Sequence, residues 1–385
     1  MPLHTSDDIA VREQLAPLFR PHTFLAGVTT LRNRLVMAPM TTYSSHPNGM
    51  ITADEIAYLR RRSKGVGMTI TAACYVSYDG HAFDGQWSCA SDEAIPSLKE
   101  AADAIREAGA LAVLQLHHGG RLCATSLLGH APLGPSAVRA ERPGADEPRE
   151  MSESEIERTI AAFGQAARRA VRAGFDGVEI HGANGYLLQQ FFSPHANRRT
   201  DQWGGSVENR AAFPIAVLEE VQEVVRRNAY RPFSIGYRLS PEEVEEEGIT
   251  TEDTLHLVEG LVACRPDWLH ISTNDYFAGS LRDRDDARAR TDMIAERVDN
   301  RTAIIGVGSV LTPDTALKIL ESGAHLVALG RELIMEPEWV EKVAAGDLDD
   351  LRVCLPAEGA DVELTIPTPM YRRMLGRPGW LPVCA

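Results

Sequence analysis

The sequence lacks paired cysteines. Its six cysteines are scattered, and no two of them form a CxxC motif; they are Cys74, Cys89, Cys123, Cys264, Cys354 and Cys384. Protein sites for zinc and for iron–sulfur clusters usually need closely spaced thiolates. We therefore expect no metal centre, thiols that pack as small buried hydrophobes, and a reducing, cytoplasmic location.

Long hydrophobic runs and an excess of basic residues are also absent. No apolar stretch approaches the roughly 18 residues that would cross a bilayer, and residues 1–19 are too acidic and too interrupted for a secretory signal. The 39 Lys and Arg residues stand against 54 Asp and Glu, a net charge of −15. This charge disfavours nucleic acid, including tRNA, and anionic membranes as partners.

Two further signatures are missing. No GxGxxG fingerprint occurs, so the sequence predicts no separate dinucleotide-binding domain. None of the strands expected below ends in a lysine, which a Schiff-base aldolase or lyase would need. The pair His117-His118 could suggest a metal, but adjacent residues of a strand point to opposite faces and no carboxylate or cysteine lies nearby in sequence, so we expect no metal ligand here.

What the chain does contain is an alternation of short β-branched runs and amphipathic helical stretches. The expected strands are Arg34–Ala38, Met68–Ala73, Leu111–Leu116, Gly177–His181, Phe233–Leu239, Trp268–Ser272, Ala303–Gly306 and Leu326–Leu329. The expected helices lie near 53–63, 94–108, 153–173, 207–227, 251–263, 287–297, 312–322 and 337–345. Eight such units predict an α/β fold, a single (β/α)₈ TIM barrel over about residues 34–345 of a one-domain chain, 1–385.

Local signals support the helix starts. Ser152 with Glu155 forms a capping box, and Thr312 with Pro313 supplies an N-cap followed by proline at the first helical position. Residues 119–150, rich in Gly, Pro and Ala, predict a long excursion after the third strand, a loop or a small hairpin over the barrel. Residues 350–385 form a C-terminal extension that could pack on its own barrel or reach a neighbouring subunit of a homo-oligomer.

Glycines mark a phosphate site. Barrels often bind phosphate with the loops after strands seven and eight, where backbone N–H groups are exposed. Here Gly308 and Ser309 follow the seventh strand, and Gly330 and Arg331 follow the eighth. The glycines would let the backbone approach a phosphate, and the arginine would add positive charge.

The end of the fourth strand carries the most informative residues. His181, Asn184 and Tyr186 lie within six residues at its carboxyl end, where catalytic groups of an α/β barrel gather. An imidazole, a carboxamide and a phenol can together polarise a carbonyl and deliver a proton. Each of them alone would more often be structural; the combination predicts an active site.

The whole stretch 178–210 resembles the signature of the old yellow enzyme family, HxxNxY followed by RxDxxGGSxExR. The resemblance implies bound FMN, NADPH or NADH as reductant, and reduction of electrophilic alkenes. In it, His181 and Asn184 bind the substrate oxygen, hydride passes from flavin N5 to the β-carbon, and Tyr186 protonates the α-carbon. Tyr43 matches a tyrosine that in one branch also contacts the substrate.

The resemblance extends to the flavin site over most of the barrel. It implies that Pro39, Met40 and Thr41 lie along the flavin ring, with the Thr41 hydroxyl on O4. Ala73 matches a position at the second strand end, Gln115 the pyrimidine edge and Arg238 the side of N1 and C2=O. Amide and guanidinium groups there would stabilise an electron-rich ring.

Several alternatives stay open at this point. The chain has neither the cysteine cluster nor the length of the iron–sulfur relatives within the family. A flavoprotein with another acceptor, such as a quinone reductase or a sensor, and a non-redox phosphate-binding lyase remain. Branch features are mixed, since Thr41 and the His/Asn pair suit one branch and Tyr43 another. The physiological substrate, the NADH or NADPH preference, the stereochemistry and the oligomeric state are not predicted.

Overall fold

The structure is a computed structural model that describes residues 13–25 and 29–384. Of the segment 1–19 that was considered as a signal, residues 1–12 therefore lie outside the described residues. In the described part of the chain no helix combines the length and the apolar character that crossing a membrane requires.

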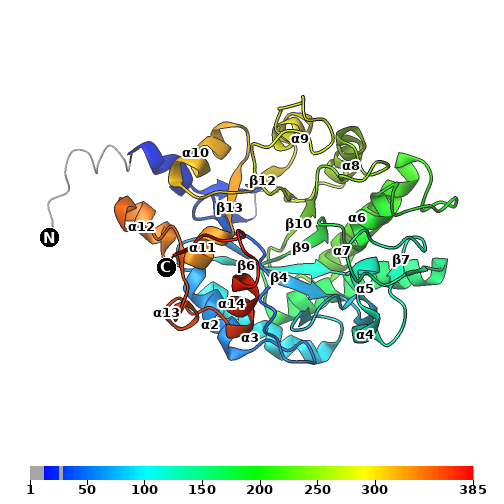
Figure 1. Ribbon diagram of the computed structural model, residues 1–385, viewed down its shortest axis with the longest axis horizontal. Coiled ribbons are helices and arrows are strands. Elements are labelled where there is room, and N and C mark those ends of the chain that lie inside the picture. Colours follow the sequence, from blue (N-terminus) through cyan, green and yellow to red (C-terminus); the bar gives the residue numbers. More distant parts are fainter. Residues whose placement is uncertain (1–12, 26–28, 385) are drawn as a thin grey trace.

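A closed barrel of parallel strands forms the centre of the molecule (Figure 1). Going round the barrel, each strand pairs with the next, and the last pairs with the first. Among the described residues these strands are β3 (Leu35–Met37), β4 (Met68–Tyr75), β6 (Leu111–His117), β9 (Gly177–Gly182), β10 (Ser234–Leu239), β11 (Trp268–Ile271), β12 (Ala303–Val307) and β13 (Leu326–Leu329). The predicted (β/α)₈ barrel and all eight of its strands are confirmed.

Helices surround the barrel where the sequence predicted them. They are α2 (Ala53–Arg62), α3 (Ile95–Glu107), α5 (Glu153–Ala173), α7 (Val207–Asn228), α8 (Thr251–Ala263), α9 (Arg290–Val298), α10 (Pro313–Glu321) and α12 (Trp339–Ala345). The predicted caps are present: Ser152 and Glu155 form a capping box, and Thr312 accepts a hydrogen bond from the Thr315 N–H (3.2 Å) with Pro313 in the first turn.

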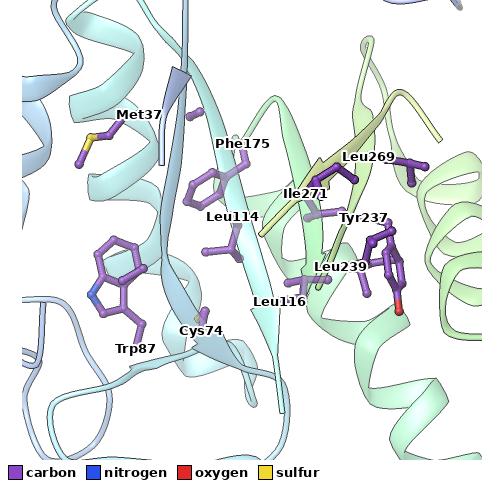
Figure 2. Close-up of a cluster of buried hydrophobic side chains, with 14 of the residues drawn as sticks. Met37, Cys74, Trp87, Leu114, Leu116, Phe175, Tyr237, Leu239, Leu269 and Ile271 are labelled. Atoms are coloured by element: carbon purple, nitrogen blue, oxygen red, sulfur yellow. The ribbon is translucent and has the colours of Figure 1, made fainter. Parts of the chain in front are cut away.

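Hydrophobic side chains fill the space between the barrel and its helices. Figure 2 shows part of this layer, with Leu114 and Leu116 on β6, Leu239 on β10 and Ile271 on β11. All four are buried, because they lie on the face of their strand that the helices cover. Successive residues of a strand point to opposite faces. The strand residues between them face the barrel interior instead.

Those inward residues are apolar at the bottom of the barrel and polar at the top. Val113 belongs to the lower apolar cluster, whereas Gln115 and His117 on the same strand lie higher. Register then brings polar neighbours together, since His181 pairs with Arg238 and Arg238 with His270. The carboxyl ends of the strands therefore carry a buried polar ring, where a barrel builds its active site.

The excursion after β6 is folded. It contains η4 (Gly120–Leu122), α4 (Thr125–Leu128) and the strands β7 (Leu133–Gly134) and β8 (Arg149–Glu150). β7 and β8 pair in parallel, so the hairpin considered for residues 119–150 is wrong; a hairpin would pair them antiparallel. Other short strands are β1 (His22–Thr23), β2 (Thr30–Leu31) and β5 (Trp87–Ser88), and other short helices are η1 (Ala16–Phe19), η2 (Tyr78–Gly80), η3 (Asp92–Ala94), α6 (Leu187–Phe192) and α11 (Arg331–Met335).

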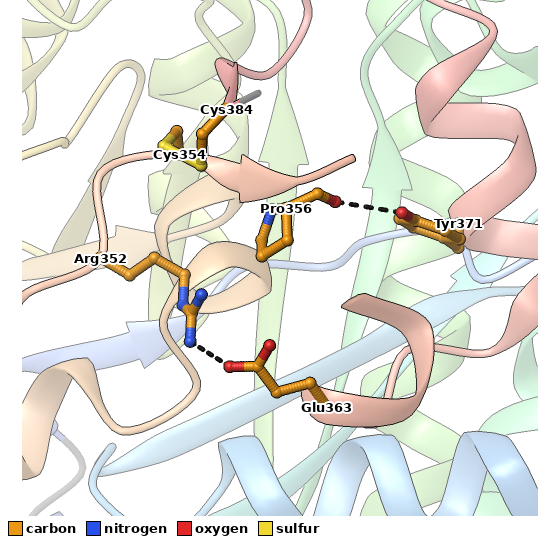
Figure 3. The surroundings of a disulfide bond; sticks show 6 residues. All are labelled: Arg352, Cys354, Pro356, Glu363, Tyr371 and Cys384. Atoms are coloured by element: carbon orange, nitrogen blue, oxygen red, sulfur yellow. Dashed lines mark hydrogen bonds and ion pairs between the residues drawn. A yellow bond between two sulfur atoms is a disulfide. The ribbon is translucent and has the colours of Figure 1, made fainter. Parts of the chain in front are cut away.

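The C-terminal extension packs on its own barrel (Figure 1). It comprises η5 (Leu348–Asp350), β14 (Leu355–Pro356), α13 (Ala360–Glu363), α14 (Thr368–Leu375) and β15 (Val383–Cys384). Figure 3 shows a disulfide between Cys354 and Cys384 that joins the two ends of this extension. The expectation that every cysteine is a small buried hydrophobe is therefore wrong for this pair. β14 and β15 pair in the fold and bring together two cysteines that are 30 residues apart in sequence.

Candidate active site

A cavity of about 530 Å³ opens at the carboxyl ends of β3, β10, β11, β12 and β13, under helix α14. This size is typical of ligand and cofactor sites. It brings together ten residues that the sequence singled out: Pro39, Met40, Thr41, Tyr43, Asn184, Arg238, Gly308, Ser309, Gly330 and Arg331. Residues at the ends of five separate strands thus meet at one place, as the barrel geometry predicts.

Four other predicted residues do not line this cavity directly. Ala73 and Gln115 are buried in the barrel wall and pair across β4 and β6. His181 and Tyr186 lie beside the cavity, next to its lining residues Arg238 and Asn184. Their rings are in contact, with centroids 5.1 Å apart and perpendicular planes.

One end of the cavity has the features expected of a phosphate site. Gly308 has a φ of 137°, and a Cβ there would lie 2.6 Å from the backbone nitrogen of Tyr276, so only glycine fits the turn. The Arg331 guanidinium donates to the Ser309 hydroxyl (2.8 Å) and to the Trp380 carbonyl (3.1 Å), which fixes it at this end. Burial, together with the carboxyl of Glu336, raises the pKa of Glu332 to about 8. Glu332 also lines the cavity, and being protonated at neutral pH it would not repel a phosphate.

The other end is held by a buried carboxylate. Glu179 accepts hydrogen bonds from the Gln115 amide (2.8 Å), the Trp268 indole (2.9 Å) and the His270 ring (2.9 Å). Burial alone would raise the pKa of Glu179, but His270, Arg238 and these donors lower it below its usual value. Glu179 therefore stays ionised and balances the charge of the buried Arg238, whose Nε has no partner among the described residues.

The loop after β3 is fixed by the buried Glu55 of α2. This carboxylate accepts from the Thr42 hydroxyl and from the Trp87 indole (2.8 Å), and it completes the capping box with Thr52. Tyr43 follows in a left-handed conformation (φ 53°), which is rare for a bulky residue and common at functional sites. Because Thr42 is anchored to Glu55, its neighbours Thr41 and Tyr43 are held at the cavity.

The hydrogen bonds around His181 and Asn184 decide which protons they present. The Ala183 N–H donates to His181 Nδ1 (3.3 Å), so the neutral ring carries its proton on Nε2. Burial and the neighbouring His117 hold the pKa of His181 well below its ordinary value, so the ring is neutral. The Ser272 hydroxyl donates to Asn184 Oδ1 (2.8 Å), which leaves the Nδ2 protons free. Each residue therefore has a donor group that forms no hydrogen bond with the described residues.

Tyr186 is placed by the short helix α6 that follows it. Gln189 accepts from the Gly185 N–H (2.9 Å), and Gln190 joins the Gly185 carbonyl (2.7 Å) to the Arg121 N–H (2.9 Å) of the β6 loop. Burial raises the pKa of Tyr186 to about 12, so the phenol keeps its proton at neutral pH. Two glutamines that the sequence did not single out thus hold the Tyr186 turn in place.

The second half of the signature is a scaffold. Arg199 pairs with Asp201 (2.6 Å) and donates to the Met151 carbonyl (2.7 Å). Arg210 pairs with Asp253 (2.7 Å) and donates to the Phe192 carbonyl (2.9 Å) at the end of α6. These arginines connect the loop after α6 to the neighbouring backbone and to the end of α6, the helix that follows Tyr186. The second half of the motif therefore stabilises the position of the first half.

The sequence left open where the C-terminal tail with Arg377 packs, and it did not single out Met370, Arg373 or Met374. The structure places all of these at the cavity, whose lining includes Met370, Arg373, Met374, Arg377 and Trp380. Arg373 lies 4.1 Å above the Tyr43 ring. His117 packs edge-on against Tyr186 (4.2 Å between ring centroids) and near His181 (5.3 Å). The sequence could have pointed to His117, because it is a polar residue at the end of a predicted strand. No local feature of the sequence places α14 at the cavity, and only the fold shows it. Among the described residues no three His, Cys, Asp or Glu side chains form a group that could hold a metal.

The site fits FMN. Its phosphate end has a glycine cradle and an arginine, and its other end has a buried guanidinium whose Nε lacks a partner within the described residues. Arg331, Gly308 and Ser309 would hold the phosphate, and Arg238 would lie at the ring. The cavity holds one phosphate site, which suits a mononucleotide.

Comparison with known proteins agrees with this geometry. The model of the NADH:flavin oxidoreductase / NADH oxidase family matches residues 17–350. A probable NADH-dependent flavin oxidoreductase, YqiG of Bacillus subtilis, is 45% identical over 368 residues, 95% of this chain and 98% of the relative. An NADH:fumarate oxidoreductase of Klebsiella pneumoniae is 41% identical over 92% of this chain, which spans only 38% of that longer protein.

Comparison with solved structures indicates the same family. An old yellow enzyme homologue from Zymomonas mobilis superimposes with a TM-score of 0.74 at 28% identity, over 84% of this chain and 91% of that one. The family resemblance drawn from the sequence is thereby confirmed. The chain belongs to the NADH:flavin oxidoreductase / NADH oxidase family, that of the old yellow enzymes, and is an FMN-dependent oxidoreductase that takes its electrons from NADH or NADPH.

Proposed function

We propose that this enzyme reduces the C=C bond of α,β-unsaturated carbonyl or nitro compounds. The observation that carries the proposal is a pair of donors, His181 Nε2–H and Asn184 Nδ2–H, that have no partner among the described residues. Asn184 lines the cavity, and His181 and the Tyr186 phenol lie beside it. Donors of this kind polarise an oxygen that withdraws electrons from a double bond. Redox relatives favour this function over a phosphate-binding lyase.

In the proposed reaction, different residues bind the substrate and donate the proton. FMN, when bound, supplies the two-electron chemistry that couples NAD(P)H to the acceptor. His181 and Asn184 bind the substrate oxygen and stabilise the negative charge that develops on it. Tyr186 holds the proton for the α-carbon, and water restores that proton later. In total, one NAD(P)H and one proton saturate one double bond.

The phenol is suited to this task by its surroundings. Its raised pKa of about 12 keeps the proton on the oxygen until a strongly basic carbon develops next to it. His117 and His181 form aromatic contacts with the ring and hold its orientation. Reduction of the enzyme by NAD(P)H transfers only a hydride and no separate proton to a substrate carbon, so that half-reaction does not need Tyr186.

The test is the pair of half-reactions of the Tyr186→Phe variant. Phe keeps the ring packing, so FMN content and the rate of reduction by NAD(P)H should stay within a few-fold of the parent. Oxidation by 2-cyclohexenone should slow by about two orders of magnitude or more, because the proton donor is gone. Oxidation by a nitroalkene should be spared, since a nitronate can leave and take a proton from water.

Stopped-flow traces decide the outcome. Equal slowing of both half-reactions would make Tyr186 a structural residue. A parent enzyme that NAD(P)H reduces but that leaves both alkenes unreduced would contradict the proposed function itself. Quinones then become the acceptors to measure.

A further inference from the structure

The disulfide between Cys354 and Cys384 closes a loop of 30 residues that contains one wall of the cavity. Helix α14 lies inside this loop. Its side chains at the cavity are spaced i, i+3, i+4 and i+7, so they share one side of the helix and of its last turn; they are Met370, Arg373, Met374 and Arg377. Trp380 follows them at the cavity. The two cysteines therefore bracket the part of the chain that covers the cavity.

The first half of this loop is tied to the barrel by helix α2. The buried Arg62 guanidinium donates to the Leu364 carbonyl (2.8 Å), and the Arg61 guanidinium donates to the Glu363 carbonyl (2.6 Å). Both acceptors lie at the end of α13. These bonds hold α13 on the barrel, and none of them involves the cysteines.

Residues 376–384, after α14, are held in another way. The Trp380 carbonyl accepts from the Arg331 guanidinium (3.1 Å), and the Pro382 carbonyl accepts from the Leu355 N–H (2.8 Å). β15 pairs with β14 over two residue pairs. An isolated ribbon of two short strands is at best marginally stable. The disulfide joins the same two strands, and it is therefore the strongest tie of this segment within the described residues.

The disulfide is open to attack by thiols. Cys354 and Cys384 are both partly exposed (Figure 3), whereas the free cysteines Cys74, Cys89 and Cys123 are buried. Thiol–disulfide exchange requires that a thiolate reach one of the sulfurs, and exposed disulfides are the ones that exchange readily.

Release of residues 376–384 would change the phosphate end of the cavity. The Arg331 guanidinium is fixed there between the Ser309 hydroxyl (2.8 Å) and the Trp380 carbonyl (3.1 Å). Without this segment Arg331 loses one of these two acceptors, and the cavity loses Arg377 and Trp380 from its lining. A site with a loosened arginine and an open wall retains a phosphate ligand less well.

We propose that Cys354 and Cys384 form a thiol–disulfide switch that sets how tightly the enzyme holds FMN. A thiolate of a dithiol attacks one sulfur of the pair and displaces the other as a thiolate. The second thiol of the reagent then displaces the first cysteine and closes its own disulfide. Two electrons and two protons pass to the protein, residues 376–384 are released, and a small-molecule disulfide reverses the step. The switch does not depend on which acceptor the enzyme reduces.

The test follows FMN release from the parent holoenzyme in its two states. One sample is treated with dithiothreitol and desalted under nitrogen; titration of the denatured protein should then find two more thiols per chain than in the untreated sample. After dilution, the rise in flavin fluorescence measures release. It should be faster by about tenfold or more in the reduced sample, because the cross-link of such a loop shifts opening by more than that. Oxidised glutathione should restore slow release.

Two cysteine variants complete the test. Cys384→Ser should release FMN at the rate of the reduced parent and respond to neither reagent. Cys264→Ser changes a partly exposed free cysteine outside the cavity and should respond as the parent does. The two states of the parent decide the matter even if Cys384→Ser does not fold. Two additional thiols with an unchanged rate of FMN release, or a native holoenzyme in which dithiothreitol exposes no additional thiols, would overturn the proposal.

Discussion

Two backbone and side-chain donors, the Ala183 N–H and the Ser272 hydroxyl, determine what His181 and Asn184 offer a ligand. Each occupies an acceptor atom and so leaves a donor atom free. Phenols should bind as phenolates with their oxygen at this pair, because charge-assisted hydrogen bonds are the strongest contacts available.

His181→Ala or Asn184→Ala should therefore weaken the binding of p-hydroxybenzaldehyde. Loss of one charge-assisted bond costs about 1.5–3 kcal/mol, or one to two orders of magnitude in affinity. The long-wavelength absorption band that the phenolate gives with FMN reports binding. Retention of parent affinity in both variants, with full FMN content, would remove the pair from the ligand site.

At the same scale, the types of the site residues could be predicted and their protons could not. A strand-end His, Asn and Tyr are visible in the sequence. The tautomer of His117 depends on its hydrogen bond with Gln86, which is 31 residues earlier and belongs to another loop. The sequence offered the His117-His118 pair only as a weak metal motif, because adjacent letters do not show what each ring faces.

At the scale of elements, helix α14 forms one wall of the cavity through Arg373, Met374 and other side chains. The barrel elements were predictable, since hydrophobic periodicity and caps are local properties. α14 has local features too, but its place over the cavity comes from long-range contacts. The hydrogen bonds from the Arg62 guanidinium to the Leu364 carbonyl (2.8 Å) and from the Arg331 guanidinium to the Trp380 carbonyl (3.1 Å) are two of them.

Two neighbouring arginines of α14 make a matched pair of variants. Both side chains are exposed, but Arg373 lies over the Tyr43 ring and lines the cavity, whereas Arg372 does not line it. Arg373→Ala removes a cation–π contact of about 0.5–1 kcal/mol and a positive charge from the cavity. Affinity for the phenolate should fall a few-fold, and Arg372→Ala should leave it unchanged. Equal titration curves for the two variants would show that α14 does not contribute to binding.

The disulfide between Cys354 and Cys384 also holds the C-terminal extension in its folded form. It closes a loop of 30 residues, and loop closure of that length stabilises by roughly 3–4 kcal/mol when chain entropy dominates. Cys384→Ser should make the extension open before the barrel, with faster cleavage between residues 351 and 384 in limited proteolysis. Cys264→Ser, at a free cysteine, is the control. An unchanged cleavage pattern in Cys384→Ser would mean that packing alone holds the extension.

At the scale of the whole molecule, buried neutral histidines couple stability to pH. His117 has a folded pKa of about 3 against about 6.5 when unfolded. Between these values the unfolded chain binds the extra proton, so the free energy of unfolding falls as the pH falls. The change is about 1.4 kcal/mol per pH unit for each such group.

His117 alone should therefore cost about 2 kcal/mol of stability between pH 6.5 and 5. Urea denaturation at pH 7, 6 and 5 measures it, and the slope should be smaller for His117→Phe than for the parent. Asp and Glu residues with lowered pKa values, such as Glu155 at about 2, change the free energy of unfolding mainly at lower pH. Identical slopes for the two proteins would show that folding does not lower the pKa of His117.

The extension has a consequence for how the enzyme responds to dilution. The cavity residues described above, including those of α14, come from a single chain. A site that no second chain completes assembles without a bimolecular step, and dilution would leave such a site intact. Activity per bound FMN should therefore be the same at nanomolar and micromolar enzyme, whether or not the chains associate, whereas a wall lent by a neighbour would be lost as the concentration falls.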